Sequence, residues 1–308
     1  MDWQPGLDTD GLRKTSKVPL CRNWEGMMNN KFKEKIGFGC YIPGKSNDEV
    51  VDIIRTAIEA GFRYFDTASF YETERALGRA IKEMAIEREQ LTIASKLWID
   101  ERGYQNTKDA LYRSLERLGV DYLDAYIIHW PRRSSDDTDW KSVDKETYKA
   151  LLELKEEGLI RNIGTSNFLS HHLKNLLDEG YVPDLNQLEL HPGYMQECAL
   201  RDSIEAGILP QAWSPLGRGA VLGNELLIKL ADKYGKSVPQ ICLIYLLQRG
   251  IMPIVKASSK ERMLNNLDVF DVILEEEDMQ IISCLPQTGW SGEHPDFNIP
   301  AITSNFNQ

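Results

Sequence analysis

The sequence predicts an α/β fold of the (β/α)₈ barrel class, in which eight parallel strands close into a ring surrounded by helices. Three observations point to this fold. Short apolar runs rich in β-branched and aromatic residues alternate with amphipathic helical windows from about residue 36 to about residue 270. Glycines stand between the helical windows and the next apolar runs. Polar residues stand at the ends of the apolar runs, where such barrels carry their sites.

Eight apolar runs are the expected strands. In chain order they are residues 36–41, 62–67, 91–96, 122–129, 160–166, 185–190, 208–214 and 252–256. Strands separated by helices require a parallel sheet with right-handed crossovers, and eight such units match a closed TIM barrel better than an open doubly wound sheet. We therefore expect the site at the carboxyl ends of the strands.

Start and stop signals mark the helices between these strands. Ser46 and Glu49 form a capping-box pattern before a helix at residues 50–60, and Gly61 is expected to end it. Later helices are expected to end at Gly158, Gly180, Gly207 and Gly250. One more helix, with an acidic first turn, is expected over residues 275–285.

Two terminal segments fall outside the alternation. Residues 1–28 show little periodicity, and we interpret them as an N-terminal extension. Residues 29–285 form the predicted barrel. Residues 286–308 are rich in Gly, Pro and Asn, and they are expected to form a C-terminal tail that is a candidate active-site lid.

Charge and composition exclude several classes of function. Lys and Arg number 36 against 47 Asp and Glu, so the net charge is −11 and the pI is near 5.1. An acidic surface repels phosphate backbones and anionic lipids, so we expect neither nucleic-acid nor membrane binding. The apolar runs are too short for a membrane helix, which needs about 20 residues. The five cysteines are scattered without a C-x-x-C pair, which is typical of free thiols in a reducing, cytoplasmic compartment.

Seven of the eight expected strands carry polar residues at their carboxyl ends. These residues are Asp66, Lys96, His129, Ser166 with Asn167, Gln187 with Glu189, Trp213 with Ser214, and Lys256. Side chains alternate between the two faces of a strand, so residues two apart share a face. Tyr64 and Asp66 share one face in this way, and so do Gln187 and Glu189. We therefore expect the polar side chains to point into one common space.

Lys96 ends an apolar strand, and a buried ammonium group needs an anionic partner. Asp66 is the expected partner. A Lys–Asp pair beside Tyr71 is expected to favour the phenolate and to lower the tyrosine pKa from about 10 toward neutral pH. A tyrosine tuned in this way is a candidate acid catalyst.

Six stretches resemble the motifs of one enzyme family. They are the D-T-A-x-x-Y pattern that ends at Tyr71 and residues 93–98, 122–131, 160–168, 186–192 and 212–219. They occur in the family's order and spacing, and the likeness runs from about residue 36 to about residue 295. On these residues the chain resembles the aldo-keto reductase superfamily, in particular its short-tailed prokaryotic NADPH-dependent aldehyde and ketone reductases.

The resemblance implies a catalytic tetrad and a nicotinamide site, without a metal. Tyr71 would donate a proton to the carbonyl oxygen, and Lys96 with Asp66 would tune its pKa. His129 would orient the substrate oxygen and assist proton transfer. The residues implied around the nicotinamide are Ser166, Asn167 and Gln187 on its carboxamide and Trp213 against its ring.

The resemblance also implies NADPH, rather than NADH, as the cofactor. Lys256, Arg262 and Asn266 match the family's clamp for the adenosine 2′-phosphate. Two cations beside a helix N-terminus are also what phosphate binding favours physically. Ala257 stands where the family often has serine, which leaves Ser258 to supply a hydroxyl group. The other residues expected to line the cofactor are Gly39, Ser214, Leu216 and Gly217.

Substrate choice is expected to come from the loops at the barrel mouth. Tyr41, Trp98 and Trp130 are expected to form an aromatic wall around a small carbonyl compound. Glu72 stands where the family often has glycine, and its carboxylate is expected to disfavour anionic substrates. We therefore expect reduction of an aldehyde or ketone to the alcohol, by a monomer or a weak homo-oligomer.

Three other functions fit single features of the chain. A barrel that binds NADPH as a regulatory or structural subunit, with little turnover, would keep the same cofactor residues. A Schiff-base aldolase would use Lys96 but would not need the phosphate clamp. A metal-dependent hydrolase needs converging ligands, whereas His171 and His172, adjacent on a helix, are expected to diverge by about 100°.

Overall fold

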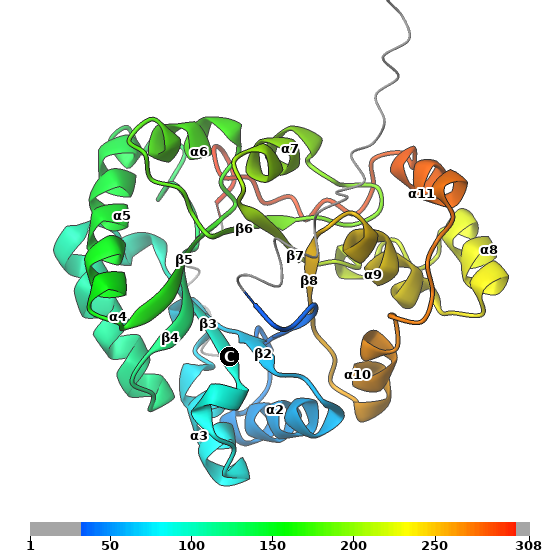
Figure 1. Cartoon of the computed structure of the whole chain (residues 1–308), viewed down its shortest axis with the longest axis horizontal. Coiled ribbons are helices and arrows are strands. Elements are labelled where there is room, and N and C mark those ends of the chain that lie inside the picture. The colour runs from blue at the N-terminus through cyan, green and yellow to red at the C-terminus, as the bar shows by residue number, and fades with distance from the viewer. Residues whose placement is uncertain (1–31, 300–308) are drawn as a thin grey trace, which may run out of the picture.

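The structure, a computed structural model, describes residues 32–299. Eight strands form a closed barrel in which each strand pairs in parallel with its sequence neighbours and the last pairs with the first. Helices ring the strands on the outside (Figure 1). The predicted (β/α)₈ barrel is therefore confirmed. The predicted extension, residues 1–28, lies outside the described residues.

Each strand lies within or close to a predicted apolar run. The strands are β1 (Gly37–Gly39), β2 (Tyr64–Asp66), β3 (Thr92–Leu97), β4 (Leu123–Ile128), β5 (Ile160–Ser166), β6 (Leu185–Glu189), β7 (Leu209–Trp213) and β8 (Met252–Val255). The helices are α2 (Asn47–Ala60), α3 (Glu74–Met84), α4 (Tyr104–Leu118), α5 (Trp140–Glu156), α6 (Ser170–Leu177), α7 (Glu197–Glu205), α8 (Glu225–Tyr234), α9 (Val238–Gln248), α10 (Lys260–Leu267) and α11 (Glu276–Ser283). Four 3₁₀ turns are η1 (Ser69–Tyr71), η2 (Arg88–Gln90), η3 (Ile99–Glu101) and η4 (Gly217–Gly219).

Local signals set the helix ends as predicted for α2. The Ser46 side chain accepts from the backbone N–H of Glu49, and the Glu49 carboxylate accepts from Ser46 N at 2.9 Å. Gly61 ends the helix with φ of 112°, a left-handed conformation that glycine adopts without steric cost. The capping box and the stop are therefore confirmed.

Small and apolar inward side chains fill the lower part of the barrel. They include Phe32, Tyr64, Ala94, Ala125, Ile127, Leu185, Leu209, Met252 and Ile254. A Cβ atom added at Gly164 would lie 2.7 Å from an Ile127 side-chain atom, so this strand position needs glycine. Because inward positions repeat every two residues, the next inward position on β2 is Asp66 and on β3 is Lys96. The filled interior thus supports a polar layer at the carboxyl rim.

The outer layer packs helices against the strands. Residues 240–247 of α9 are all buried, because α8 and α10 pack on α9 while it contacts β8. In residues 32–299 we find no helix long and apolar enough to cross a membrane. The cysteines of this range are free thiols: Cys40, Cys198, Cys242 and Cys284.

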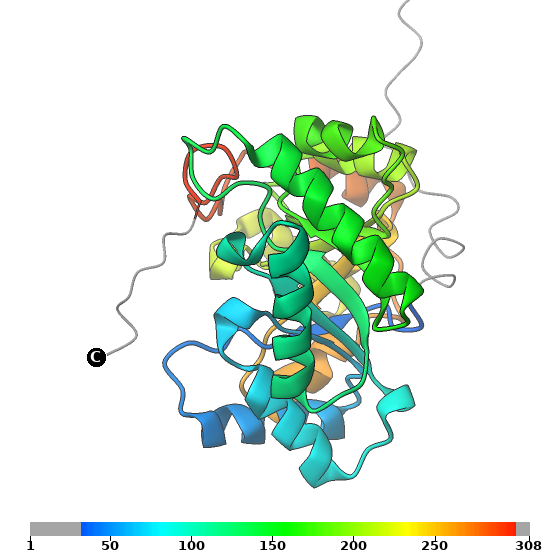
Figure 2. The same cartoon turned by 90° about the vertical axis from the view of Figure 1, so that its left-hand side faces the viewer.

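The described part of the C-terminal tail lies at the end of the barrel that carries the strand-end loops. Figure 2 shows its last residues, in red, beside the loop between β4 and α5. Arg132 of that loop lies 3.1 Å from the Asp296 carboxylate of the tail. Residues 300–308 of the predicted tail lie outside the described range.

Candidate active site

Four predicted polar side chains meet at the carboxyl rim of β2, β3 and β4. Lys96 on β3 forms an ion pair with Asp66 at the end of β2. The Lys96 Nζ atom also lies 3.3 Å from the Tyr71 hydroxyl oxygen at the end of η1. The same hydroxyl oxygen lies 3.4 Å from Nε2 of His129, which directly follows β4. The structure therefore brings the predicted constellation into mutual contact.

Lys96 is fully buried, with a side-chain exposure of 0%. Its ammonium has three acceptors: the Asp66 carboxylate, the Thr67 carbonyl oxygen at 3.2 Å and the Tyr71 hydroxyl. Burial lowers the Lys96 pKa, but Asp66 and Tyr71 raise it by more than burial lowers it, so the net pKa lies above its usual value. The lysine therefore remains a permanent cation under the tyrosine.

The pKa of Tyr71 moves opposite to the sequence-based expectation. Burial raises it to about 12, and the lowering by Lys96 is too small to offset this. The expectation that the tyrosine pKa is lowered toward neutral pH was wrong, because it counted the neighbouring ammonium and not the loss of solvent. A phenol with this pKa is protonated at neutral pH and is therefore available as a proton donor.

His129 is held in the neutral form. Burial first, and then the charge of Lys96, holds the pKa of His129 well below its usual range. Its Nδ1 atom is buried and has no hydrogen-bond partner among residues 32–299, and Nε2 is the ring nitrogen that meets Tyr71. An uncharged imidazole at this point can exchange hydrogen bonds with an oxygen atom placed between it and the phenol.

Gln187 holds the second carboxylate oxygen of Asp66, and Gln211 in turn holds Gln187. Gln187 Nε2 donates to Asp66 Oδ2 at 2.9 Å and to Gln211 Oε1 at 3.1 Å. Gln211 Nε2 in turn donates to the Tyr64 hydroxyl at 3.0 Å. The sequence analysis missed Gln211, although its position two residues before the end of β7 marks it as inward-facing.

The residues predicted around a nicotinamide form one hydrogen-bonded group at the ends of β5, β6 and β7. Trp213 Nε1 donates to Asn167 Oδ1 at 2.8 Å. Asn167 Nδ2 donates to the His129 carbonyl oxygen at 3.0 Å and to Ser166 Oγ at 3.2 Å. Ser166 Oγ donates to the Gln187 carbonyl oxygen at 2.9 Å. A carboxamide ligand would therefore add to this network or exchange partners with it.

Two cationic side chains, Lys256 and Arg262, stand near the start of α10. Lys256 follows β8 directly, and both Lys256 and Arg262 are exposed; across residues 32–299 neither forms an ion pair. Ser259, not Ser258, caps the helix by accepting from Arg262 N at 3.4 Å. Asn266 lies one turn after Arg262, on the same helix face, and is buried. Two free cations beside a helix N-terminus fit a phosphate dianion.

The remaining predicted cofactor residues lie along the same rim. Gly39 pairs in register with Asp66 at the end of β1. Ser214 and Gly217 both have positive φ, 48° and 54°, in the turn after β7, and Leu216 lies between them. A Cβ atom on Gly217 would lie 3.1 Å from the His191 ring, so the backbone there is closely packed from below.

Two of the three predicted substrate residues, Tyr41 and Trp98, lie against Tyr71 and His129, and the third, Trp130, packs with Trp98. The Tyr41 ring lies 4.9 Å from the Tyr71 ring and is 43% exposed. Trp98 lies edge-on to His129 at 5.0 Å and clusters with buried Trp130. The buried indole Nε1 of Trp98 has no hydrogen-bond partner in the described part of the chain, which leaves a donor beside the site.

Side chains of the tail, which the sequence analysis named as a candidate active-site lid, contact the same end of the barrel through partners that the sequence pattern did not reveal. Ser291 donates to both carboxylate oxygens of Glu189, from its backbone at 2.9 Å and from its hydroxyl at 2.8 Å. Arg218 in the turn after β7 forms a 2.9 Å ion pair with Glu293. These contacts join positions 102 and 75 residues apart, so no local periodicity signals them.

The expectation that His171 and His172 diverge was wrong. Their ring centroids lie 3.8 Å apart, and each Nε2 lies 3.2 Å from Asp296 Oδ1 of the tail. Neighbouring helix positions differ by about 100° at the backbone, but long side chains in a first turn can swing toward one carboxylate.

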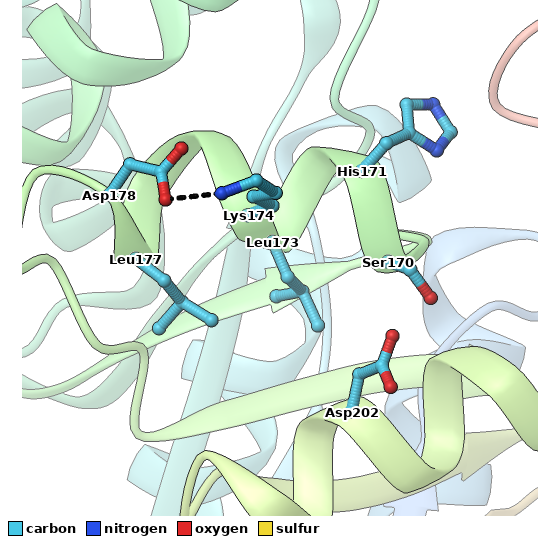
Figure 3. A pocket seen from close by; sticks show the side chains of 7 residues that line it. All are labelled: Ser170, His171, Leu173, Lys174, Leu177, Asp178 and Asp202. Atoms are coloured by element: carbon cyan, nitrogen blue, oxygen red, sulfur yellow. Dashed lines mark hydrogen bonds and ion pairs between the residues drawn. The ribbon is translucent and has the colours of Figure 1, made fainter.

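A pocket of about 500 Å³ lies outside the barrel between α6 and α7. Figure 3 shows Leu173 and Leu177 pointing into it, with the Lys174–Asp178 ion pair above them and Asp202 of α7 on the other side. None of the predicted site residues of the described chain lines it. It is therefore separate from the cluster at the barrel mouth.

Comparison with known proteins agrees with this geometry. The aldo/keto reductase family matches residues 35–285. Glyoxal reductase of Bacillus subtilis is 42% identical over 254 residues, which cover 82% of this chain and 89% of that protein. Methylglyoxal reductase DkgA of Escherichia coli is 38% identical over 254 residues, covering 82% and 90%.

A solved structure extends the likeness to three dimensions. The structure of an aldo-keto reductase from Bombyx mori in complex with NADP is 35% identical, with a TM-score of 0.73, and the match covers 80% of this chain and 87% of that one. The family match spans more than half of the chain, and the relatives exceed 30% identity. The chain therefore belongs to the aldo/keto reductase family, and it is an oxidoreductase of the class that acts on carbonyl and alcohol groups.

Proposed function

We propose that the protein reduces a small aldehyde or ketone to the alcohol, with NADPH as the hydride donor. The observation that carries this proposal is the position of the Tyr71 hydroxyl, in contact with both Lys96 Nζ and His129 Nε2. Membership of the aldo/keto reductase family and the NADP complex of a 35% identical member support it.

Tyr71 is the proposed proton donor. Its phenol is protonated at neutral pH, and the substrate oxygen gains basicity as it becomes an alkoxide, so the proton moves at that point. The phenolate left behind lies 3.3 Å from the Lys96 ammonium, which stabilises it. Asp66 keeps that ammonium charged and in place. NADPH, when bound, supplies the hydride.

His129 is the proposed positioning group for the substrate oxygen. Because it is neutral and buried, its Nε2 can share a hydrogen bond with an oxygen that also contacts Tyr71. Placing the oxygen at these two groups directs the carbonyl carbon toward the residues of the nicotinamide site. The side chains proposed to hold the nicotinamide are Ser166, Asn167, Gln187 and Trp213.

The residues of the α10 end fit NADPH. Lys256 and Arg262 are cations without carboxylate partners in the described chain, and Asn266 lies on the same face of α10 as Arg262. We assign these three residues to the adenosine 2′-phosphate. Ala257 offers no hydroxyl group there, so the two cations carry most of the preference for NADPH. The turn residues Gly39, Ser214, Leu216, Gly217 and Ser258 line the rest of the proposed cofactor path.

Small α-oxoaldehydes are the proposed substrate class. Two relatives at 42% and 38% identity are named glyoxal and methylglyoxal reductases. In this chain the free indole N–H of Trp98 lies beside His129, where it could bind the second oxygen of such a compound. Tyr41 and Trp130 supply apolar walls, and exposed Glu72 disfavours anionic substrates.

The test of this function is NADPH consumption against a panel of carbonyl compounds. The panel contains glyoxal, methylglyoxal, simple aldehydes, ketoacids, sugars and cyclic ketones. We expect turnover with the dicarbonyls, and we expect Tyr71→Phe to lower kcat by about 10²- to 10⁴-fold, the usual contribution of a general acid. Tyr112→Phe is the matched control, because Tyr112 is an exposed residue of α4.

Each other outcome has a defined meaning. NADPH binding without turnover on any carbonyl compound would favour a regulatory or structural barrel. Absence of NADPH binding would show that the proposed cofactor site is wrong. Turnover that survives Tyr71→Phe unchanged would remove the proposed proton donor and leave the reductase class in place.

Cofactor preference has a separate test. Arg262→Ala should weaken NADPH binding by about 10- to 100-fold, because a hydrogen bond to a charged group contributes about 1.5–3 kcal/mol. NADH binding should be unchanged. Lys260→Ala is the control, because Lys260 is a neighbouring exposed cation that pairs with Glu59 at 3.4 Å. An equal loss for NADPH and NADH would contradict the 2′-phosphate assignment.

A further inference from the structure

Three of the five histidines of the chain gather around one carboxylate, away from the proposed active-site chemistry. His171 and His172 belong to the first turn of α6, and His294 and Asp296 belong to the tail. The cluster therefore joins two segments that lie more than 100 residues apart in the sequence. Figure 3 shows the His171 ring turned away from Leu173 and Leu177 of the neighbouring pocket.

The ligand atoms of this cluster converge. Nε2 of His171 and Nε2 of His172 each lie 3.2 Å from Oδ1 of Asp296, and one atom from each of the three residues fits within 4.8 Å of the others. Ligands about 2.0–2.1 Å from a tetrahedral ion lie about 3.3 Å apart. The spacing between the histidines and the carboxylate matches that value.

A second observation comes from the His172 ring, whose side chain is fully buried. Its Nδ1 atom accepts from the backbone N–H of Leu169 at 3.2 Å, so the neutral ring carries its proton on Nε2. That Nε2 atom is aimed into the cluster, 3.2 Å from Asp296 Oδ1, but within residues 32–299 it makes no contact of full hydrogen-bond geometry. A metal ion bound in place of the Nε2 proton would give this buried nitrogen a partner of good geometry.

We propose that His171, His172 and Asp296 bind one divalent transition-metal ion, with Zn²⁺ as the best match, and that this ion fastens the tail to α6. Two imidazoles and one carboxylate are the donors that Zn²⁺ prefers, with water in the fourth position. Magnesium and calcium ions prefer all-oxygen sites and are excluded by this donor set.

Two features of the cluster oppose tight binding and set the expected affinity. Arg132 Nη1 lies 3.1 Å from Asp296 Oδ1, so its positive charge repels a second cation. Ligation by His172 Nε2 also moves the ring proton to Nδ1, which costs the hydrogen bond from Leu169 N. We therefore expect a dissociation constant in the micromolar range.

His294 provides a matched control because it is close to the cluster without belonging to the ligand set. Its Nδ1 atom accepts from Asp296 N at 3.1 Å, and it lies 3.9 Å from Asp296 Oδ2. Its ring stacks on Phe297 at 3.8 Å. The His294 nitrogen that faces Asp296 is therefore already engaged, and His294 is not among the residues whose ligand atoms converge.

The test is calorimetric titration of the metal-stripped full chain with Zn²⁺, followed by titration with Co²⁺ and visible absorption. We expect one Zn²⁺ site that weakens by about 100-fold or more in His171→Ala and in Asp296→Asn, because each change removes a ligand. His294→Ala should keep the affinity. Co²⁺ should show the absorption of a four-coordinate ion in the unmodified protein and in His294→Ala alone.

A separate readout concerns the tail. Zn²⁺ should protect the tail from proteolysis in the unmodified protein and in His294→Ala, and it should not do so in His171→Ala. Thermal unfolding without metal checks that the variants fold; His171 is about half exposed, so its replacement is tolerated. Absence of binding, or equal affinity in all variants, as a cysteine site elsewhere would give, overturns the proposal.

Discussion

Replacement of Asp66 by asparagine tests whether the buried Lys96 charge depends on a single carboxylate. In the structure Lys96 is 0% exposed, and its other two acceptors, the Thr67 carbonyl and the Tyr71 hydroxyl, are uncharged. Asp66→Asn keeps the shape and removes only the charge. Breaking a buried ion pair by removing one partner costs about 3–5 kcal/mol, because the remaining charge is left uncompensated.

The double variant Asp66→Asn with Lys96→Met separates this cost from other effects. Removing both charges replaces the buried pair with uncharged groups, which is often close to neutral for stability. We therefore expect the double variant to recover most of the lost stability, while both variants lack carbonyl reduction. The interaction energy between the two changes should be several kcal/mol.

The assay is thermal and urea unfolding followed by circular dichroism. For a domain of this size about 1 kcal/mol corresponds to a Tm change of about 2–4 °C, so Asp66→Asn should lower Tm by about 6–20 °C. A loss below about 1 kcal/mol for Asp66→Asn would refute the reasoning. A double variant no more stable than the single one would refute it as well, because the Lys96 charge would then not be the source of the cost.

Two further predictions concern stability. Burial raises the pKa of Glu189 from 4.5 to about 6, so protonation of Glu189 favours the folded state. The stability gained from this protonation is fully present below pH 4.5 and is lost as the pH rises through 6. Glu189→Gln, which keeps a partner for Ser291, should abolish this pH dependence and stabilise the protein by about 1–2 kcal/mol at pH 8. Urea unfolding at several pH values measures this effect, and an equal pH slope in both proteins would contradict it. Gly78→Ala should destabilise by about 2 kcal/mol or more despite the higher helix propensity of alanine, because the new Cβ would lie 2.2 Å from the Leu118 carbonyl oxygen. Gly223→Ala, where the space is open, is the control, and an equal effect at both positions would sink the clash argument.

The sequence alone determined the barrel and the members of the polar cluster. Strand positions follow from alternation with period two, and helix ends follow from capping residues and glycine, which are all local signals. The same alternation placed Asp66 above Tyr64 on the inward face, and ion pairing placed Asp66 beside Lys96. The same alternation also marks Gln211 as inward-facing on β7, although Gln211 was not among the predicted site residues.

The tertiary structure decided the energetics of the site and the course of the tail. The pKa of Tyr71 is the difference between a burial effect and a charge effect, and only the packed structure gives their relative size. Ser291 reaches Glu189 across 102 positions, and Asp296 reaches His171 across 125. Contacts of an irregular segment over such separations depend on where the rest of the chain has already folded. No short-range pattern in the sequence encodes them, so the convergence on Asp296 became visible only in three dimensions.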